Sequence, residues 1–373
     1  MIFAIYADNF RVFTSCQPQR GLLKQFIQDN PRDKFVFYLH KKFEADETIT
    51  TFFEGLSNSD NWSFVFLRTP QKISRLKQLF GIASPNLPLG ADFYISPDIE
   101  TFGRHCRPVI NFLADMTVFD DTRHTSLSKF NSWFRRVCIS RMANRTDLIL
   151  AVSQFTKSRF EYHFPHARNK VKVFYNGIDS QWFDQIKALK ENKHDPYWVW
   201  MGAGYSSRKN IDRLLQAYNE LRRDSRKPVP NLRMVGLDLD SIEVIRQKGH
   251  ELNIQQFLIL ESKVPLIKLI EIVDLSAGLV FPSIYEGFGL PVVEAFSRGK
   301  AVLTSNVSSL PEISNGLGML CDPTDVDSIR VGLSSMLDIM EDDEFAVARR
   351  TWAKQFNYRT ASAMLYEILD ELK

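Results

Sequence analysis

Residues 279–295 read LVFPSIYEGFGLPVVEA, which is a short apolar run, a loop with two glycines and the start of a helical pattern. A short apolar run bounded by turn residues is typical of a buried parallel strand. Pro291 suits the first position of a helix, and Gly287 and Gly289 leave the preceding backbone amides free to face a ligand. The stretch therefore predicts a strand, a ligand-binding loop and a helix, the repeating unit of an α/β fold.

Two carboxylates stand across this loop at a spacing of Glu-x7-Glu. Glu294 lies about one turn into the predicted helix, where a carboxylate can accept hydrogen bonds from both hydroxyls of a ribose. Glu286 precedes the helix and can reach a sugar hydroxyl. The alternative is a glycine-rich turn with two solvated glutamates, but the spacing of the two carboxylates across the loop favours a binding site.

Similar apolar runs recur along the whole chain. In the first half they are Ile2–Tyr6, Phe35–Leu39, Phe64–Leu67, Val109–Leu113, Leu148–Val152 and Val171–Tyr175. In the second half they are Trp198–Met201, Leu232–Val235, Phe257–Leu260, Leu279–Pro282, Ala301–Thr304 and Gly318–Leu320. Helical patterns separate them, as at Ile211–Arg222, Leu266–Val273 and Pro291–Ser297. This alternation predicts two doubly wound α/β units.

Length and composition agree with two folded domains. At 373 residues the chain exceeds the usual size of one hydrophobic core, and 44% hydrophobic with 24% charged residues excludes a disordered or collagen-like chain. We predict an N-terminal domain over 1–180, a linker over 181–196, a second domain over 197–354, and a C-terminal helix over 355–373 that can pack back on the first domain. Two facing domains of this kind are expected to form a cleft.

A second loop has the features of a phosphate-binding site. After the run Trp198–Met201 come Gly202, Gly204 and the adjacent cations Arg208 and Lys209, directly before a helical pattern. Glycines permit close backbone approach, and the free N–H groups of a helix N-terminus attract anions. Taken alone the loop is weak evidence, because a basic pair before a helix is often only surface.

These motifs together resemble the retaining family-4 glycosyltransferases, whose B-type fold is two facing Rossmann-like domains. The resemblance is carried by Glu286–Glu294, by Arg208-Lys209-Asn210, by Ala151–Thr156, by Asn176–Asp179 and by Ser308–Glu312, and it is continuous over roughly residues 144–330. The loop Ser308–Glu312 looks most like mannosyltransferases of bacterial polysaccharide assembly.

The resemblance implies a role for each matching residue. Arg208 and Lys209 would hold the donor diphosphate and stabilise its departure, Glu294 would bind the ribose, and Glu286 the donor sugar. The remaining donor-binding positions are the loop residues Gly202, Gly204, Gly287, Phe288, Gly289 and Leu290.

The N-terminal half departs from the family pattern. Many members have a His-Asp pair after an apolar strand, whereas this chain has Ala114 in place of the histidine and retains Asp115. Asp115 is a candidate catalytic residue, and a cap of a helix or turn is the alternative.

The family resemblance implies no metal and no cofactor beyond the nucleotide sugar. Asp238 and Asp240 match an Asp-x-Asp metal pattern but have no further acidic cluster, and His163 and His166 show no carboxylate or Cys partner in sequence. The four cysteines, Cys16, Cys106, Cys138 and Cys321, form no CxxC motif, which favours a reducing compartment.

The charge distribution suggests an anionic membrane surface as a partner. Residues 1–180 carry 24 Lys and Arg against 17 Asp and Glu, whereas residues 181–373 carry 23 against 27. The basic excess lies in Arg68–Lys77, interpreted as a solvated face, and in Lys129–Arg145, which reads equally well as a solvated helix or as a membrane-facing one.

With Asp8 interrupting the first apolar run, we expect no signal peptide and a cytoplasmic protein at the inner membrane face.

The resulting hypothesis is a hexosyltransferase that moves mannose from GDP-mannose to a hydroxyl of a lipid-linked or growing polysaccharide. The alternatives are a UDP-hexose donor and a catalytically degenerate assembly partner. A nicotinamide oxidoreductase is disfavoured because no GxGxxG follows Ile2–Tyr6. No nucleic-acid partner is expected.

Overall fold

The computed structural model describes residues 1–11, 17–56, 60–67, 90–99, 102, 106, 108–120, 128–184, 195–339 and 343–372. It divides into two compact units. The first contains the described residues up to Gly177 together with the stretch from Asn357, and the second contains those of Ile178–Phe356. The basic segment Arg68–Lys77 and Cys16 lie outside the described residues.

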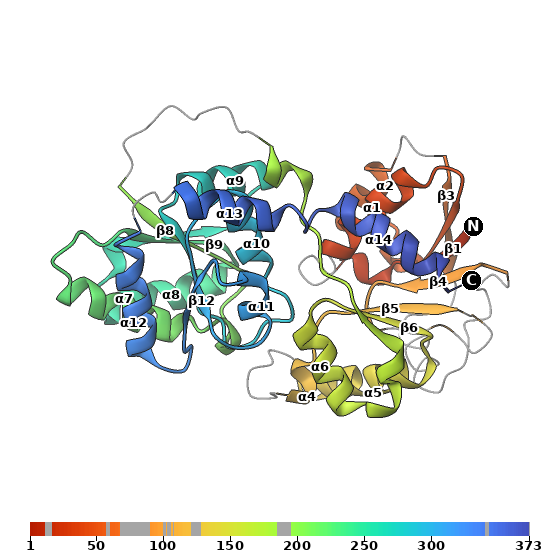
Figure 1. Ribbon diagram of the computed structural model, residues 1–373, viewed down its shortest axis with the longest axis horizontal. Coiled ribbons are helices and arrows are strands. Elements are labelled where there is room, and N and C mark those ends of the chain that lie inside the picture. The colour runs from red at the N-terminus through yellow and green to blue at the C-terminus, as the bar shows by residue number, and fades with distance from the viewer. Residues whose placement is uncertain are drawn as a thin grey trace. The chain divides into compact units, whose positions relative to one another are not determined.

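The first unit is built on a parallel sheet of seven described strands in the order β3-β2-β1-β4-β5-β6-β7. These strands are β1 (Ile2–Tyr6), β2 (Lys34–His40), β3 (Trp62–Leu67), β4 (Phe93–Ser96), β5 (Val109–Leu113), β6 (Leu148–Ala151) and β7 (Val171–Val173). Its helices are α1 (Gln17–Asp29), α2 (Glu47–Glu54), α4 (Thr117–Asp120), α5 (Lys129–Arg145), α6 (Gln154–His163) and α14 (Tyr358–Asp370), with 3-10 turns at Asp8–Arg11, Lys41–Phe43 and Pro165–Lys170. Figure 1 shows α1, α2 and α14 on one face of the sheet and α4, α5 and α6 on the other.

An aromatic core fills the space between the sheet and α1 and α14. The rings of Phe3 and Phe35 stack with centroids 5.0 Å apart, and Phe26 of α1 meets Phe3 edge to face at 5.4 Å. Such pairs add about 0.5–1.5 kcal/mol beyond the area they bury. The apolar residues of β1 and β2 therefore fix the position of the strand ends in this unit.

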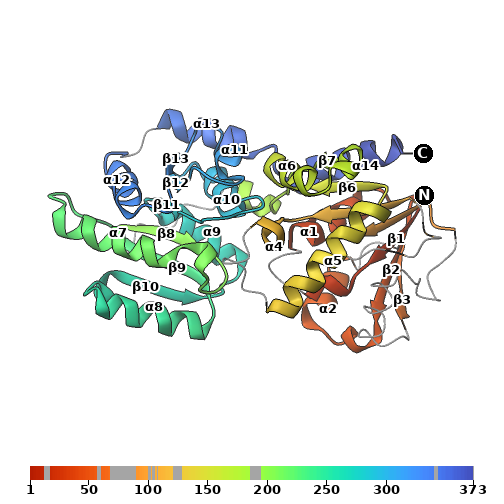
Figure 2. The same cartoon turned by 90° about the horizontal axis from the view of Figure 1, so that it is seen from below.

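The second unit has a parallel sheet in the order β10-β9-β8-β11-β12-β13. Its strands are β8 (Tyr197–Met201), β9 (Asn231–Leu237), β10 (Leu258–Ser262), β11 (Gly278–Phe281), β12 (Val302–Ser305) and β13 (Met319–Cys321). Its helices are α7 (Ile211–Asp224), α8 (Leu239–Glu251), α9 (Leu266–Leu275), α10 (Leu290–Ser297), α11 (Leu310–Ser314), α12 (Val326–Met336) and α13 (Asp343–Ala353), with 3-10 turns at Ser180–Phe183, Ser207–Lys209 and Gln255–Phe257. Figure 2 shows these strands side by side in this order, from β10 to β13. The predicted fold class, two parallel-sheet Rossmann-like α/β domains, is confirmed.

The C-terminal helix α14 packs in the first unit, against α1 (Figure 1). A side chain at Gly21 of α1 would come within 2.1 Å of the ring of Tyr358, so the two helices approach too closely for any residue larger than glycine. Ser362 also donates a hydrogen bond of 2.6 Å to Asp29 at the end of α1. The last helix thus completes the core of the unit that contains the first strand.

The structure places the division between the units differently from the sequence-based boundary. It falls at Gly177–Ile178 and not after residue 180, and Trp182, predicted to lie in the linker, is buried in the second unit. The predicted linker residues 185–194 lie outside the described residues. The strand β4 had no counterpart among the predicted strands.

Candidate donor-binding site

The order of strands in the second unit reverses between β8 and β11, which lie side by side. In open α/β sheets, ligands bind in the crevice outside the carboxyl ends of the strands, at the point where the strand order reverses. The loops after β8 and β11 are the two that the sequence marked, at Gly202–Asn210 and Pro282–Gly289. The fold therefore brings both predicted donor loops to the same place.

The structure joins the two loops through one carboxylate. The Nη1 atom of Arg208 lies 2.9 Å from Oε2 of Glu286, and the Nζ atom of Lys209 lies 2.8 Å from Oε1. A backbone hydrogen bond of 2.8 Å, from the amide of Ile284 to the carbonyl of Arg208, ties the loops together beside the ion pairs. The sequence predicted these three charged residues separately, and the structure shows that they form one cluster.

Burial gives this cluster unusual electrostatics. Burial alone would raise the pKa of Glu286, but the charges of Arg208 and Lys209 outweigh it and lower that pKa to about 2. Burial lowers the pKa of Lys209, an effect that the charge of Glu286 opposes. Glu286 is therefore ionised at neutral pH and holds both cations at the mouth of the loop.

Two polar side chains of neighbouring loops hold the cluster in shape. Asn210 adopts a left-handed backbone with φ 58°, and its buried amide donates to the carbonyls of Pro282 at 3.0 Å and Pro323 at 2.7 Å. The hydroxyl of Ser309 lies 2.9 Å from the carbonyl of Glu286 and 2.7 Å from that of Phe288. In a trans peptide the N–H points opposite to the C=O. The carbonyls of Glu286 and Phe288 point toward Ser309, so the amides of Gly287 and Gly289 in the same peptides point away from it.

The glycine loop leads directly into α10. Gly289 caps the helix with φ 111°, and a side chain there would approach Leu310 to 2.9 Å, so only glycine fits without strain. Leu290 begins the helix, so Pro291 occupies the second position of the first turn and not the first position that the sequence predicted. The N-terminal end of this eight-residue helix thus adds its free amides to the charges of the cluster.

Glu294 lies in α10 and is half-buried. Burial raises its pKa to about 7, well above the usual value for a carboxyl group. Its protonation therefore changes around neutral pH.

We expect nucleotide affinity to rise between pH 6 and pH 8, because ionised Glu294 accepts stronger hydrogen bonds from the ribose hydroxyls than the protonated acid does. Glu294→Ala should weaken nucleotide binding by roughly 1.5–3 kcal/mol while the fold stays intact. Calorimetric titration with nucleotide at several pH values measures both effects. Glu294→Gln is the matched variant that keeps the shape and should abolish the pH dependence. An unchanged nucleotide affinity in the Ala variant would exclude Glu294 from the site.

Comparisons with known proteins place the chain in a family. Residues 183–351 match the model described as "Glycosyl transferases group 1", and residues 116–182 match "Glycosyltransferase Family 4". The chain belongs to the family-4 glycosyltransferases. The matched range contains the whole cluster described above.

Individual relatives of this family-4 member include proteins of envelope polysaccharide assembly. It is 32% identical over 227 residues to the "O-antigen chain mannosyltransferase B" of Escherichia coli, covering 58% of each chain. It is 27% identical to a "GDP-mannose-dependent alpha-(1-6)-phosphatidylinositol monomannoside mannosyltransferase" of Mycolicibacterium smegmatis, covering 63% of this chain and 65% of the relative. The matched region thus spans less than two thirds of the length of either relative.

Solved structures extend the likeness of fold to the whole chain. The Anabaena protein HepE, crystallised in complex with UDP-glucose, superposes with a TM-score of 0.73 at 14% identity, covering 100% of both chains. This similarity supports the shared two-domain fold.

Asp115, the remaining candidate catalytic residue of this family-4 member, lies in the first unit just after β5. Its carboxylate accepts a hydrogen bond of 3.0 Å from the amide of Thr117, the first residue of α4. This is the capping arrangement that the sequence left as an alternative.

The two metal-like patterns have other partners. Asp238 caps α8 by accepting from the amide of Ser241 at 2.7 Å, and hydrogen bonds from Ser241 lower its pKa. His163, expected to lack a carboxylate partner, in fact contacts Asp120 at 2.7 Å through Nε2, and Arg159 binds the same carboxylate. The sequence could not show this pair because α4 and α6 meet only in the fold. Among the described residues no group of three or more His, Cys, Asp or Glu side chains is arranged to hold a metal.

The structure also changes the view of the basic segment Lys129–Arg145, which forms α5. Arg135 faces Asp98 at 3.5 Å, and Nε of Arg136 donates to the carbonyl of Val118 at 2.5 Å. These cations are engaged within the unit. At the start of α5, however, Phe130 is 68% exposed and Trp133 is 52% exposed.

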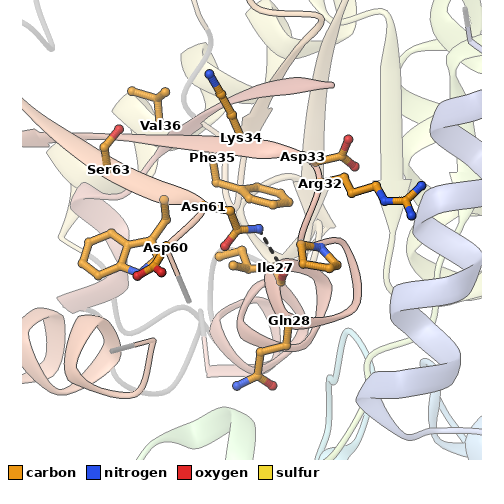
Figure 3. Close-up of a pocket in the computed structure, with 12 residues that line it drawn as sticks. Ile27, Gln28, Arg32, Asp33, Lys34, Phe35, Val36, Asp60, Asn61 and Ser63 are labelled. Carbon is orange, nitrogen blue, oxygen red and sulfur yellow. Dashed lines mark hydrogen bonds between the residues drawn. The ribbon is translucent and has the colours of Figure 1, made fainter. Parts of the chain in front are cut away.

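A cavity of about 800 Å³ lies in the first unit, at the amino ends of β2 and β3 (Figure 3). Asn61 spans its floor and donates to the carbonyls of Ile27 at 3.3 Å and Asn30 at 3.0 Å. Its amide is thus engaged by the backbone, and the position at the amino edge is not where ligands bind in such sheets. None of its lining residues belongs to the predicted site.

Ser309 and Asn210 were not predicted as site residues. Both stand beside the motifs that were, and the signal that marks them is a polar residue directly before a helix that follows a buried strand, at the carboxyl edge of the sheet. No helix in the described part of the chain is long and apolar enough to cross a bilayer.

Proposed function

We propose that the chain is a retaining hexosyltransferase that transfers mannose from GDP-mannose to a hydroxyl of a lipid-linked or growing polysaccharide. The observation that carries this proposal is the cluster of Arg208, Lys209 and Glu286 at the strand reversal of the second unit. Two cations at a helix N-terminus fit a diphosphate, and Glu294 one turn into the helix fits a ribose.

The chemistry follows from where charge develops. The main barrier is the departure of the diphosphate, which leaves an oxocarbenium-like sugar, and cations placed at the leaving oxygen stabilise that state. Arg208 and Lys209 take this role. The carboxylate of the cluster, Glu286, has one oxygen paired with Arg208 and the other with Lys209. We therefore infer same-face attack in which the leaving phosphate oxygen accepts the proton of the acceptor hydroxyl.

The choice of donor rests on the relatives. Both mannosyltransferases named above support mannose, and one of them is named for GDP-mannose. The complex of HepE with UDP-glucose supports the second candidate, a UDP-hexose. A degenerate assembly partner is the third candidate and predicts donor binding without turnover.

A panel of nucleotide sugars tests the proposal. A ligand at 100 times its Kd adds about 2.7 kcal/mol to the free energy of unfolding. When all nucleotide sugars are tested at the same concentration, the one with the lowest Kd should give the largest thermal shift, and we expect this to be the true donor. Transfer of radiolabelled mannose from GDP-mannose to octyl α-mannoside then measures turnover. A larger shift with UDP-glucose than with GDP-mannose would favour the second donor, and binding without transfer or hydrolysis would favour the degenerate partner.

We expect transferase activity to survive treatment with EDTA, because the proposed charge stabilisation uses two side chains and a helix N-terminus. Activity is measured after dialysis against EDTA and again after addition of Mg²⁺ or Mn²⁺. A complete loss that either ion restores would contradict the prediction and direct attention to Asp238 and Asp240.

We further propose that the chain docks on an anionic membrane through the start of α5. Phe130 and Trp133 lie with ring centroids 6.0 Å apart, and both are exposed. Lys129 is exposed beside them, and α5 contains no acidic residue. Exposed aromatic rings beside cations suit the interface of a bilayer, where each cation adds about 1 kcal/mol.

Sedimentation with liposomes tests this docking. Phe130→Ser with Trp133→Ser should abolish most binding to anionic vesicles, and high salt should weaken binding of the unaltered chain, since the Debye length shrinks to about 3 Å at 1 M salt. Met364→Ser on α14 is the matched control, because Met364 is also an exposed apolar residue of the first unit. Binding that ignores lipid charge and the aromatic pair would contradict the proposal.

A further inference from the structure

A second polar cluster lies at the carboxyl edge of the sheet in the first unit. Asp8 follows β1 directly, and His40 is the last residue of β2. These strands pair in parallel, with Tyr6 opposite Tyr38, so their carboxyl ends meet. The side chains of Asp8 and His40 are both almost fully buried, with 1% and 2% of their surface exposed.

Asp8 is held by donors on both of its oxygens. The backbone amide of His40 donates to Oδ1 at 2.8 Å, and the hydroxyl of Tyr6 donates to Oδ2 at 2.9 Å. Nδ1 of His40 also contacts Oδ2. Because an ionised carboxylate can only accept, Nδ1 carries the proton, and in the neutral imidazole the lone pair lies on Nε2.

The Nε2 atom of His40 is buried and has no hydrogen-bond partner within the described part of the chain. A buried polar atom without a partner costs about 1–3 kcal/mol, and such atoms in native proteins call for an explanation. Asp8 fixes the ring so that this atom is held in one place. The chain therefore maintains, at a cost in stability, one oriented acceptor at the edge where ligands bind.

Gln19 carries another buried acceptor without a partner among the described residues, on the opposite face of the sheet from His40. Gln19 lies in the first turn of α1, which follows β1, and it is 2% exposed. Its Nε2 donates to Asn176 at 3.3 Å, whereas its Oε1 is buried and unpaired. Asn176 follows β7, so this contact too lies at the carboxyl edge of the sheet.

We propose that His40, oriented by Asp8, binds a hydroxyl group of the acceptor sugar. This inference rests on the proposed function. A buried acceptor requires a ligand that brings a donor, and the hydroxyls of a sugar are neutral O–H donors. An anion would meet lone pairs, and a metal ion would need further ligands, whereas the described residues contain no group of three or more His, Cys, Asp or Glu side chains arranged to hold one.

Binding must open this edge, because Nε2 is shielded from solvent in the unliganded chain. His40 is thus an acceptor-binding residue, Asp8 is a positioning residue, and the donor cluster belongs to the other unit. A change at His40 should therefore alter acceptor KM and leave the affinity for nucleotide unchanged.

A pair of conservative variants separates binding from structure. His40→Asn places an amide nitrogen where Nδ1 stands and keeps the bond to Asp8, whereas His40→Gln places an amide oxygen near the position of Nε2. With GDP-mannose as donor and octyl α-mannoside as acceptor, we expect His40→Asn to raise acceptor KM roughly tenfold, the loss of one hydrogen bond. His40→Gln should recover part of the loss, and the melting temperature of His40→Asn should change little.

His163→Gln is the matched control, since His163 pairs with a carboxylate in the same unit but has its Nε2 occupied by Asp120. It should leave acceptor KM unchanged. If the unaltered chain transfers mannose and His40→Asn keeps its acceptor KM, the inference is overturned while the proposed function stands. A chain that neither binds nor turns over any nucleotide sugar would overturn the proposed function.

Nuclear magnetic resonance gives a test that does not require turnover. With [15N]histidine, the Nε2 signal of His40 is followed while octyl glycosides of mannose, glucose, galactose and N-acetylglucosamine are added. We expect a shift with at least one glycoside that His40→Gln lacks and His163→Gln retains. No shift of that signal with any of the four overturns the inference, whatever the activity assays show.

Discussion

Replacing Arg208 or Lys209 by alanine should lower kcat/KM by roughly 10²-fold or more, because each cation stabilises negative charge that develops on the leaving diphosphate. Binding of the bare nucleoside should change far less than binding of the nucleoside diphosphate. Calorimetry with GDP and guanosine, and with UDP and uridine, measures this difference alongside steady-state kinetics.

Arg246→Ala provides the control for these variants. Arg246 lies in α8 of the same unit and pairs with Glu243 on the exposed surface, so its removal should leave both kinetics and nucleotide affinity nearly unchanged. Equal losses of affinity for nucleoside and diphosphate in the Arg208 or Lys209 variant would show a structural role in place of the proposed one.

Glu286→Gln should produce the second large effect, a loss of both activity and stability. It removes the carboxylate that neutralises Lys209 in a buried site, and breaking a buried ion pair from one side costs roughly 3 kcal/mol or more. Activity should fall by 10²-fold or more, since both cations lose the group that positions them. Chemical denaturation and steady-state kinetics measure the two losses separately.

The pH dependence of this variant has a definite sign. Burial holds the pKa of Lys209 below its value in the unfolded chain, and the loss of Glu286 lowers it further. At a pH between the pKa of Lys209 in the folded chain and its pKa in the unfolded chain, the unfolded chain binds more protons than the folded chain does, so stability rises with pH. This range is wider in Glu286→Gln, so the stability of that variant should rise with pH more steeply than that of the unaltered chain. The exposed pair offers the control Glu243→Gln, whose stability should change by no more than about 0.5 kcal/mol. A Glu286→Gln chain as stable as the unaltered one at pH 7 would contradict the buried-pair argument.

Much of the fold followed from the sequence because the strands are buried on both faces. The runs Ile2–Tyr6 and Val109–Leu113 match β1 and β5 residue for residue. Such strands appear as continuous apolar runs, which hydrophobicity alone reveals. The strand β4, with the sequence FYIS, was not among the predicted strands.

The candidate site was predictable as a set of residues but not as an arrangement. The loops carrying Lys209 and Glu286 were marked by glycines, charges and helix starts, all of which are local features. The ion pair between these two residues joins positions 77 apart and depends on β8 and β11 being neighbours in the sheet. The same applies to Asp8 and His40, which meet only because β1 and β2 pair.

The basic segment in α5 illustrates a different limit. Composition correctly showed cations without acidic neighbours in that helix, but it could not show where each side chain goes. Arg135 and Arg136 turn out to contact Asp98 and Val118. A single helix supplies both internal and external contacts, and only the packing of the neighbouring elements decides which.

The return of α14 to the first unit has a consequence for synthesis on the ribosome. Ala361, Leu365, Ile368 and Leu369 of α14 belong to the same core as β1. The first unit therefore cannot be completed until α14 has emerged, whereas the second unit is continuous in sequence from Ile178 to Phe356 apart from its undescribed stretches. During translation the second unit should therefore fold before the first unit is complete. Until α14 is made, the apolar face of the first unit that α14 covers stays exposed. A stop codon just before α14 would then leave the second unit folded and the first one prone to aggregation and proteolysis.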